Sequence, residues 1–120
     1  ADRERCWATL LDLEPAFVLG SPKCAPFSVL QHLNKNKDSP ETKAKYDDGV
    51  RHLEFVAEVY TWQCKRGAYF LHEHPWQATS WKLGCMEAVA GLTGVERRRG
   101  DQCRFGLRLK DRDGVERLAL

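Results

Sequence analysis

One stretch constrains the fold of this chain more than any other, a long amphipathic segment between two short apolar runs. Its apolar residues recur every three or four positions, at Tyr46, Val50, Leu53, Ala57, Tyr60 and Cys64. This spacing places them on one face of an α-helix. Ser39 and Pro40 are residue types typical of a helix start, and Gly67 is typical of a helix end. The sequence therefore predicts one long helix from Pro40 to a stop at Gly67.

The two runs that flank this helix, 16–19 and 68–71, contain only apolar residues. Unbroken runs of this length are typical of strands that are buried on both faces of a parallel sheet. The order strand, helix, strand also favours a right-handed parallel crossover. We therefore predict an α/β fold, a three-layer sandwich with a mostly parallel sheet.

Further elements are predicted on either side of this unit. Residues 2–13 form an amphipathic helix that ends at Pro15, with Cys6, Trp7, Leu10 and Leu11 on its apolar face. The segment 22–40 is loop-like, with one helical turn near Phe27 and a mobile polar loop at 31–40.

The C-terminal third is predicted to hold a second helix and a hairpin. Thr79 or Ser80 caps the helix, whose apolar residues run from Trp81 to Leu92. Residues 95–99 are predicted as an edge strand. Residues 107–110 and 115–120 flank the turn 111–114 and form a C-terminal antiparallel hairpin.

Composition indicates one soluble domain that spans 1–120. The chain has 120 residues, 42% hydrophobic and 30% charged, and a net charge of +2 that is too small to argue for a nucleic-acid partner alone. No apolar run approaches the roughly 18 residues of a membrane span, and no signal peptide is visible. Five cysteines without CxxC spacing predict reduced thiols and an intracellular location.

Cys24 is the first candidate for chemistry. It lies just past the first predicted strand, in the loop 20–28, which Pro22 and Pro26 stiffen. A thiol in this position is well placed as a nucleophile, and Lys23 beside it would stabilise the thiolate. The alternative is a structural cysteine packed under the loop.

Glu73 is the second candidate, in the loop after the second predicted strand. Because the carboxyl ends of parallel strands meet at one edge of a sheet, this loop and the Cys24 loop should be neighbours. A carboxyl group there could bond a substrate ring and move a proton. The alternative is a solvated loop tip, with His72 and His74 satisfied by the backbone.

Two other patterns suggest binding. His72 and His74, with Cys24 or Cys103, could form a zinc site. Residues 95–112 hold seven basic and three acidic side chains, a balance of +4. Such a patch either follows a phosphate backbone or is a solvated, charged sheet edge.

Three segments together resemble the motifs of cytosine-C5 methyltransferases. The loop 20–28, with Cys24 and the following Phe27-Ser28, resembles their Pro-Cys loop, and 72–75 resembles their Glu-Asn-Val loop. Residues 101–108 resemble, more faintly, their Asp-Tyr-Gly…Arg segment. The resemblance covers most of residues 10–110 and is closer to divergent segments of phage and retroelement polyproteins than to restriction-system enzymes.

The resemblance implies a partial Rossmann-like, class I methyltransferase-like fold and a role for each matching residue. Cys24 would attack C6 of cytosine, and Glu73 would hold the ring nitrogen. Arg108, or alternatively Arg104, would contact the base or orient Glu73. S-adenosylmethionine would supply the methyl group. The partner would be nucleic acid, DNA rather than RNA, with the target base flipped out of any duplex. Its predicted contacts are Ser28, Arg97, Arg98, Arg99 and Arg104.

The chain also departs from the family pattern. Lys23, His74 and Pro75 replace the second proline, the asparagine and the valine of the motifs. The Gly-rich cofactor loop has no counterpart and would precede residue 1, while the target-recognition region would follow residue 120. We therefore expect a domain that is incomplete or inactive alone and needs a companion segment or self-association. The alternatives are a non-catalytic nucleic-acid-binding scaffold on the same fold and a small zinc-stabilised domain.

Overall fold

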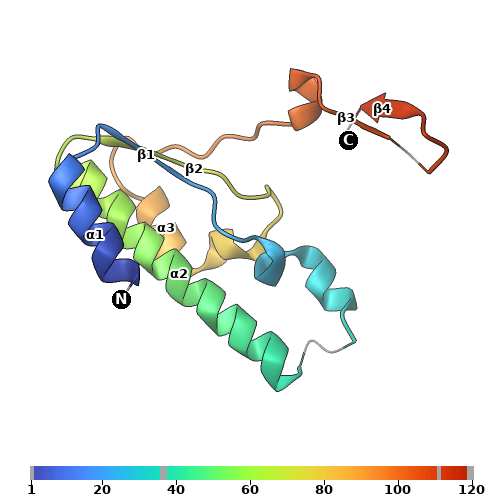
Figure 1. The fold of residues 1–120 in the computed structure, drawn as a ribbon, viewed down its shortest axis with the longest axis horizontal. Helices are drawn as coiled ribbons and strands as arrows, with labels where there is room; N and C mark the ends of the chain where they lie inside the picture. The colour runs from blue at the N-terminus through green and yellow to red at the C-terminus, as the bar shows by residue number, and fades with distance from the viewer. Residues whose placement is uncertain (1, 36–37, 111, 119–120) are drawn as a thin grey trace.

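A long helix between two parallel strands forms the centre of the computed structural model (Figure 1), which describes residues 2–35, 38–110 and 112–118. Strand β1 (Phe17–Gly20) pairs in parallel with β2 (Tyr69–His72), and α2 (Pro40–Lys65) connects them. The register runs from Phe17 opposite Tyr69 to Gly20 opposite His72. The predicted strand–helix–strand unit is therefore confirmed.

Shorter elements surround this unit. They are, in chain order, α1 (Asp2–Leu13), the 3₁₀ helices η1 (Ala25–Phe27), η2 (Val29–Leu33) and η3 (Thr79–Lys82), α3 (Gly84–Ala90), the 3₁₀ helix η4 (Gln102–Phe105), β3 (Arg108–Lys110) and β4 (Glu116–Leu118). β3 and β4 form the predicted antiparallel hairpin, with Arg108 opposite Leu118. Residues 36–37 of the predicted mobile loop and Asp111 of the predicted turn lie outside the described residues.

The ends of α2 follow from local chemistry. The Ser39 hydroxyl accepts a hydrogen bond from the Thr42 backbone N–H at 3.2 Å, and Pro40 occupies the first turn. Lys65 lies in the last turn, where a positive charge favours the helix dipole. Gly67 adopts φ +71°, a conformation that costs a glycine little.

The core lies between α2 and its neighbours, in two adjoining clusters. Phe27, Leu53, Ala78 and Met86 form one cluster. Ala57, Tyr60 and Val89 form the other, against Val18 and Phe70 of the sheet. Gly20 has no room for a side chain, because a Cβ there would collide with the Tyr60 hydroxyl.

Only one face of the β1–β2 sheet is covered in the described part of the chain. Along both strands exposed and half-buried residues alternate, so Val18 and Phe70 face the core. The opposite face carries Phe17, Leu19, Tyr69 and Leu71, which are 54–70% exposed. The structure is thus a mixed α/β arrangement with a two-stranded parallel sheet and a separate antiparallel pair.

The N-terminal helix has the predicted bounds but a narrower contact face. Trp7 packs edge-on against Phe55 and Trp62 of α2, with ring centroids 6.1 and 5.6 Å apart. Leu10 is half-buried, whereas Cys6 and Leu11 are exposed. None of the helices in the described ranges has the length and apolar character needed to cross a membrane.

Two predictions after β2 need correction. The helix predicted from Thr79 or Ser80 is present as α3 but is shorter, and Leu83 precedes its first residue. The reason is that the Thr79 hydroxyl donates to the Phe27 carbonyl, and the Ser80 hydroxyl bonds to His74. The edge strand predicted at 95–99 is irregular, because Arg97 is held between two tryptophans rather than beside a strand.

Candidate active site

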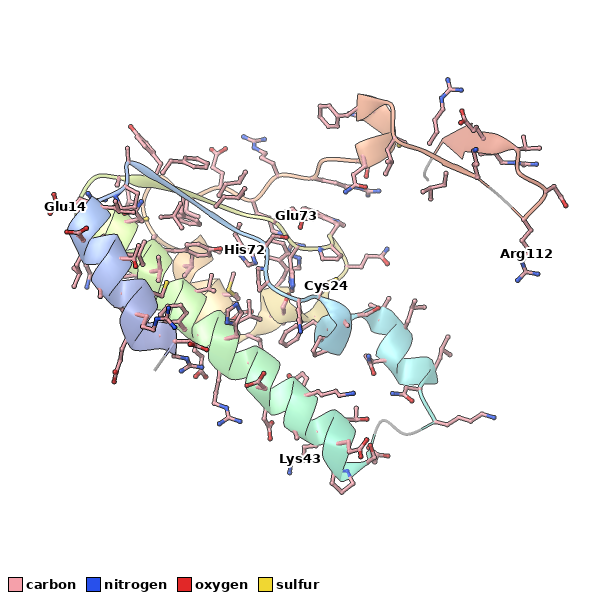
Figure 2. All side chains as sticks on the ribbon, viewed as in Figure 1. Glu14, Cys24, Lys43, His72, Glu73 and Arg112 are labelled. Atoms are coloured by element: carbon pink, nitrogen blue, oxygen red, sulfur yellow. The ribbon has the colours of Figure 1, made fainter. Side chains whose placement is uncertain are left out.

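Two loops meet at the carboxyl edge of the β1–β2 sheet. Ser21 follows β1 and Glu73 follows β2, and the Ser21 hydroxyl donates to Glu73 Oε2 at 3.0 Å. The Glu73 backbone N–H also donates to the Gly20 carbonyl at 2.9 Å. The Cys24 loop and the Glu73 loop are therefore neighbours, as the sequence led us to expect (Figure 2).

Cys24 lies at the end of the first of these loops. It is exposed, unpaired and placed immediately before η1, and its carbonyl accepts from the Phe27 N–H at 2.9 Å. Pro22 and Pro26 restrict the backbone on either side of it. The thiol is accessible to a substrate, and its backbone is fixed by the turn that follows.

The buried side chain of His74 packs against the loop that carries Cys24. Its side chain is 7% exposed, and its Nδ1 lies 2.5 Å from the Ser80 hydroxyl. Its ring packs against Phe27, with centroids 6.0 Å apart. Burial lowers the pKa of His74, while backbone groups of Lys23 and Pro22 act in the opposite direction. The loop that carries Cys24 therefore rests on a side chain from the loop that carries Glu73.

His72 is held in the same way from α2. Its Nδ1 lies 2.7 Å from the Tyr60 hydroxyl. Burial and, to a smaller extent, the neighbouring His74 lower the pKa of His72 to about 4, against the opposing effect of Glu73. Burial also raises the pKa of the Tyr60 phenol. At neutral pH His72 is therefore uncharged.

The zinc ligands suggested by the sequence are not assembled. His72, His74, Glu73 and Cys103 line one cavity of about 800 Å³. Yet no three histidine, cysteine, aspartate or glutamate side chains among the described residues gather as metal ligands. The Nε2 atoms of both histidines are buried without a hydrogen-bond partner.

Three of the four arginines predicted to contact nucleic acid are engaged within the chain. The Arg97 guanidinium lies 4.0 and 4.1 Å from the ring centroids of Trp76 and Trp81, and it donates to the Trp76 carbonyl at 2.6 Å. Arg98 pairs with Glu96 at 2.7 Å, and Arg99 pairs with Asp101 at 2.9 Å. Neighbouring carboxylates thus neutralise part of the predicted basic patch.

The remaining predicted site residues lie in different places. Arg108 is exposed on β3, and the hairpin stands apart from the β1–β2 sheet in Figure 1. Arg104 is exposed in η4. Ser28 is half-buried, and its hydroxyl accepts from the Leu30 N–H at 3.2 Å to cap η2. The structure therefore joins the loop that carries Cys24 to Glu73 through Ser21, and it leaves Arg108 on a hairpin that stands apart from the sheet.

The described residues do not form the cofactor site that the resemblance implies. The loop after β1 holds Cys24, and the loop after β2 holds Glu73, so neither parallel strand leads into a glycine-rich turn. The glycines with positive φ, namely Gly67, Gly94, Gly106 and Gly114, lie elsewhere. The glycine-rich loop that the resemblance requires for S-adenosylmethionine is therefore not found after either strand in the described residues.

Sequence reasoning gave no role at this site to three residues that build it. Ser21 bonds to Glu73, Tyr60 bonds to His72, and Ser80 bonds to His74. For Ser21 a signal existed, because Ser21 and Glu73 stand equally far beyond the two apolar runs. Tyr60 and Ser80 carried no comparable signal, since their partners depend on how α2 and η3 pack.

Comparison of this chain with models of known families, with curated proteins and with solved structures found no match.

Proposed function

We propose that this chain is part of a cytosine-C5 methyltransferase-like domain of Rossmann-like, three-layer architecture that acts on nucleic acid. In this domain Cys24 is the nucleophile and Glu73 holds the cytosine ring. The observation that carries the proposal is the Ser21–Glu73 hydrogen bond across the carboxyl edge of the parallel strands. This hydrogen bond joins the loop that carries the exposed Cys24 thiol to the Glu73 carboxyl group. A thiol nucleophile and a carboxyl group that bonds to the ring are the two groups proposed for addition to a pyrimidine.

The step assigned to these residues is nucleophilic addition. The Cys24 thiolate forms a bond from Sγ to C6 of cytosine, and the electron pair of the C5–C6 double bond moves to C5. A hydrogen bond from Glu73 to the ring favours the added state. C6 is inaccessible in a base stack, so the target base must be single-stranded or flipped out.

The proposal for this chain stops at that addition. S-adenosylmethionine is the expected methyl donor of such a domain, but its binding requires residues other than those at the Cys24–Glu73 edge. Arg108 has no part in the addition, because the hairpin that carries it stands apart from the sheet.

Covalent trapping tests the proposal without a cofactor. A single-stranded oligonucleotide that contains 5-azacytosine forms a stable adduct with an attacking thiol, which a denaturing gel and mass spectrometry detect. We expect an adduct with the wild-type chain and none with Cys24→Ser. Cys6→Ser is the matched control, since Cys6 is also an exposed, unpaired thiol.

The outcomes separate the function hypotheses. An adduct that survives in Cys24→Ser would remove the nucleophile assignment. A wild-type chain that binds the oligonucleotide but forms no adduct would overturn the catalytic proposal and favour a non-catalytic scaffold. A slower adduct in Glu73→Gln, with unchanged binding, would support the ring-holding role of Glu73.

A further inference from the structure

A groove opens directly beside the Cys24 loop. It has a volume of about 680 Å³ and lies between the two 3₁₀ helices that follow Cys24 and the start of α2. Its lining includes Ala25, Ser28, Gln31, Lys43, Lys45 and Tyr46. Figure 2 shows Cys24 on the loop that leads into η1 and Lys43 near the start of α2. The groove is thus continuous with the loop of the proposed nucleophile.

The wall of this groove is fixed by hydrogen bonds of its own. The Gln31 side chain donates to the Ala25 carbonyl at 3.0 Å, and the Ser28 hydroxyl caps η2. The Tyr46 ring packs against the buried Phe27 ring, with centroids 5.5 Å apart, and Tyr46 remains 40% exposed. Packing against the buried Phe27 therefore keeps one face of the Tyr46 ring exposed to the groove.

The charge of the groove is positive. Lys43 and Lys45 are exposed, and Asp38 is the acidic residue of the lining, which leaves one net positive charge. Neither Lys43 nor Lys45 takes part in the ion pairs that join Arg98 to Glu96 and Arg99 to Asp101. Both lysine charges therefore remain available to a ligand of the groove.

We propose that this groove binds the backbone of the nucleic-acid strand next to the target base. Lys43 and Lys45 contact phosphates, and the exposed face of Tyr46 stacks on a flanking base. A positive groove combined with an aromatic platform is the arrangement that holds single-stranded nucleic acid. Because Ala25, the residue next to Cys24, lines the groove, a strand lying in it runs beside the loop of the proposed nucleophile. This inference rests on the proposed function and adds where the nucleic-acid substrate binds.

The test is the salt dependence of binding of a fluorescein-labelled, single-stranded deoxyoligonucleotide, measured by anisotropy. Each phosphate contact contributes about 0.7 to the slope of log K against log salt for a single strand. We expect Lys43→Ala/Lys45→Ala to weaken binding and to lower that slope by about 1.4. The matched control is Lys65→Ala/Lys82→Ala, which removes the same charge from exposed positions outside the groove.

The result that overturns the proposal is an equal change in both double variants, or no change in Lys43→Ala/Lys45→Ala. Tyr46→Leu, which keeps an apolar side chain against Phe27, should weaken binding about tenfold through lost stacking without changing the slope. Failure here is distinguishable from failure of the proposed function. An adduct at Cys24 with unaltered binding in the lysine variant would refute the groove alone, whereas groove binding without an adduct would refute the nucleophile alone.

Discussion

His72 and His74 are kept uncharged by their packing, and Tyr60 and Ser80 fix the orientation of their rings. Both contacts use Nδ1, which leaves Nε2 of each ring buried. The two histidines lie on either side of Glu73, so their packing determines where that carboxyl group stands. A proton added to either ring would place a charge where burial disfavours it. The geometry of the edge is therefore linked to pH.

We expect the chain to lose stability as pH falls from about 6.5 to 4. An unfolded histidine titrates near pH 6.5, while His72 in the folded chain titrates near pH 4. In that window the unfolded chain binds a proton that the folded chain does not, so the free energy of unfolding decreases with falling pH. Urea unfolding across this range measures the effect.

His72→Asn should make this pH dependence weaker, with the remainder due to His74. His52→Asn provides the control, because His52 is exposed on α2. An identical pH dependence in His72→Asn and in the wild-type chain would contradict the explanation.

At the scale of elements, the C-terminal end of α2 fixes where both strands begin. Gln63 is fully buried, and its amide donates to the carbonyls of Pro15 and Tyr69 at 3.0 and 2.9 Å. Arg66 donates to the Gln63 amide oxygen and to the Pro15 carbonyl. One side chain therefore joins the helix to the segment before β1 and to the first residue of β2. The register of the sheet, and with it the meeting of Ser21 and Glu73, depends on this junction.

Gln63→Leu should lower the free energy of unfolding by about 3 kcal/mol, since it removes the two hydrogen bonds that Gln63 donates and the one that it accepts from Arg66, each worth about 1 kcal/mol. The Pro15 carbonyl keeps Arg66 as a partner, which limits the loss. Gln77→Leu, at an exposed position, should change stability by less than about 0.5 kcal/mol. Urea unfolding of the two variants compares them, and equal losses would disprove the role of the junction.

At the scale of the whole molecule, one face of the β1–β2 sheet exposes apolar side chains that no segment in the described part of the chain covers. Phe17 lies opposite Tyr69, and Leu19 lies opposite Leu71, so four large apolar side chains form one patch. Parallel sheets are almost always covered on both faces, and a two-stranded sheet is marginal alone. A patch of this kind favours association in water.

We expect the chain to self-associate as its concentration rises, and Leu19→Ser/Leu71→Ser to reduce that association. Sedimentation velocity over a range of concentrations measures it. Leu30→Ser/Leu33→Ser is the matched control, because Leu30 and Leu33 are also exposed but lie in η2, away from the sheet. Equal effects of the two double variants, or a wild-type chain that stays monomeric throughout, would contradict this role of the sheet face.

Local signals accounted for much of the fold. The capped start of α2, its glycine stop and the C-terminal hairpin matched the structure. The two apolar runs form the paired parallel strands, but the prediction that both of their faces are buried is wrong, because one face is exposed. Each of these predictions depends on residues a few positions apart, or on the apolar character of one short run. The meeting of the loop after β1 with the loop after β2 also followed, because Ser21 and Glu73 stand at equal positions beyond two parallel strands.

What sequence reasoning could not determine were contacts between side chains that are distant along the chain. Thr79 and Ser80 are residue types that often cap helices. In the structure the Thr79 hydroxyl instead bonds to the Phe27 carbonyl, and the Ser80 hydroxyl bonds to His74. Arg97 looks like a phosphate ligand, but Trp76 and Trp81 enclose it.

The sequence alone therefore determined which segments are helical or extended and which two loops share an edge, since periodicity and capping act within a few residues. The tertiary structure decided which polar side chains remain available for a ligand. A hydroxyl or guanidinium can bond to many partners, and the one it takes depends on which segments the packed core brings within reach.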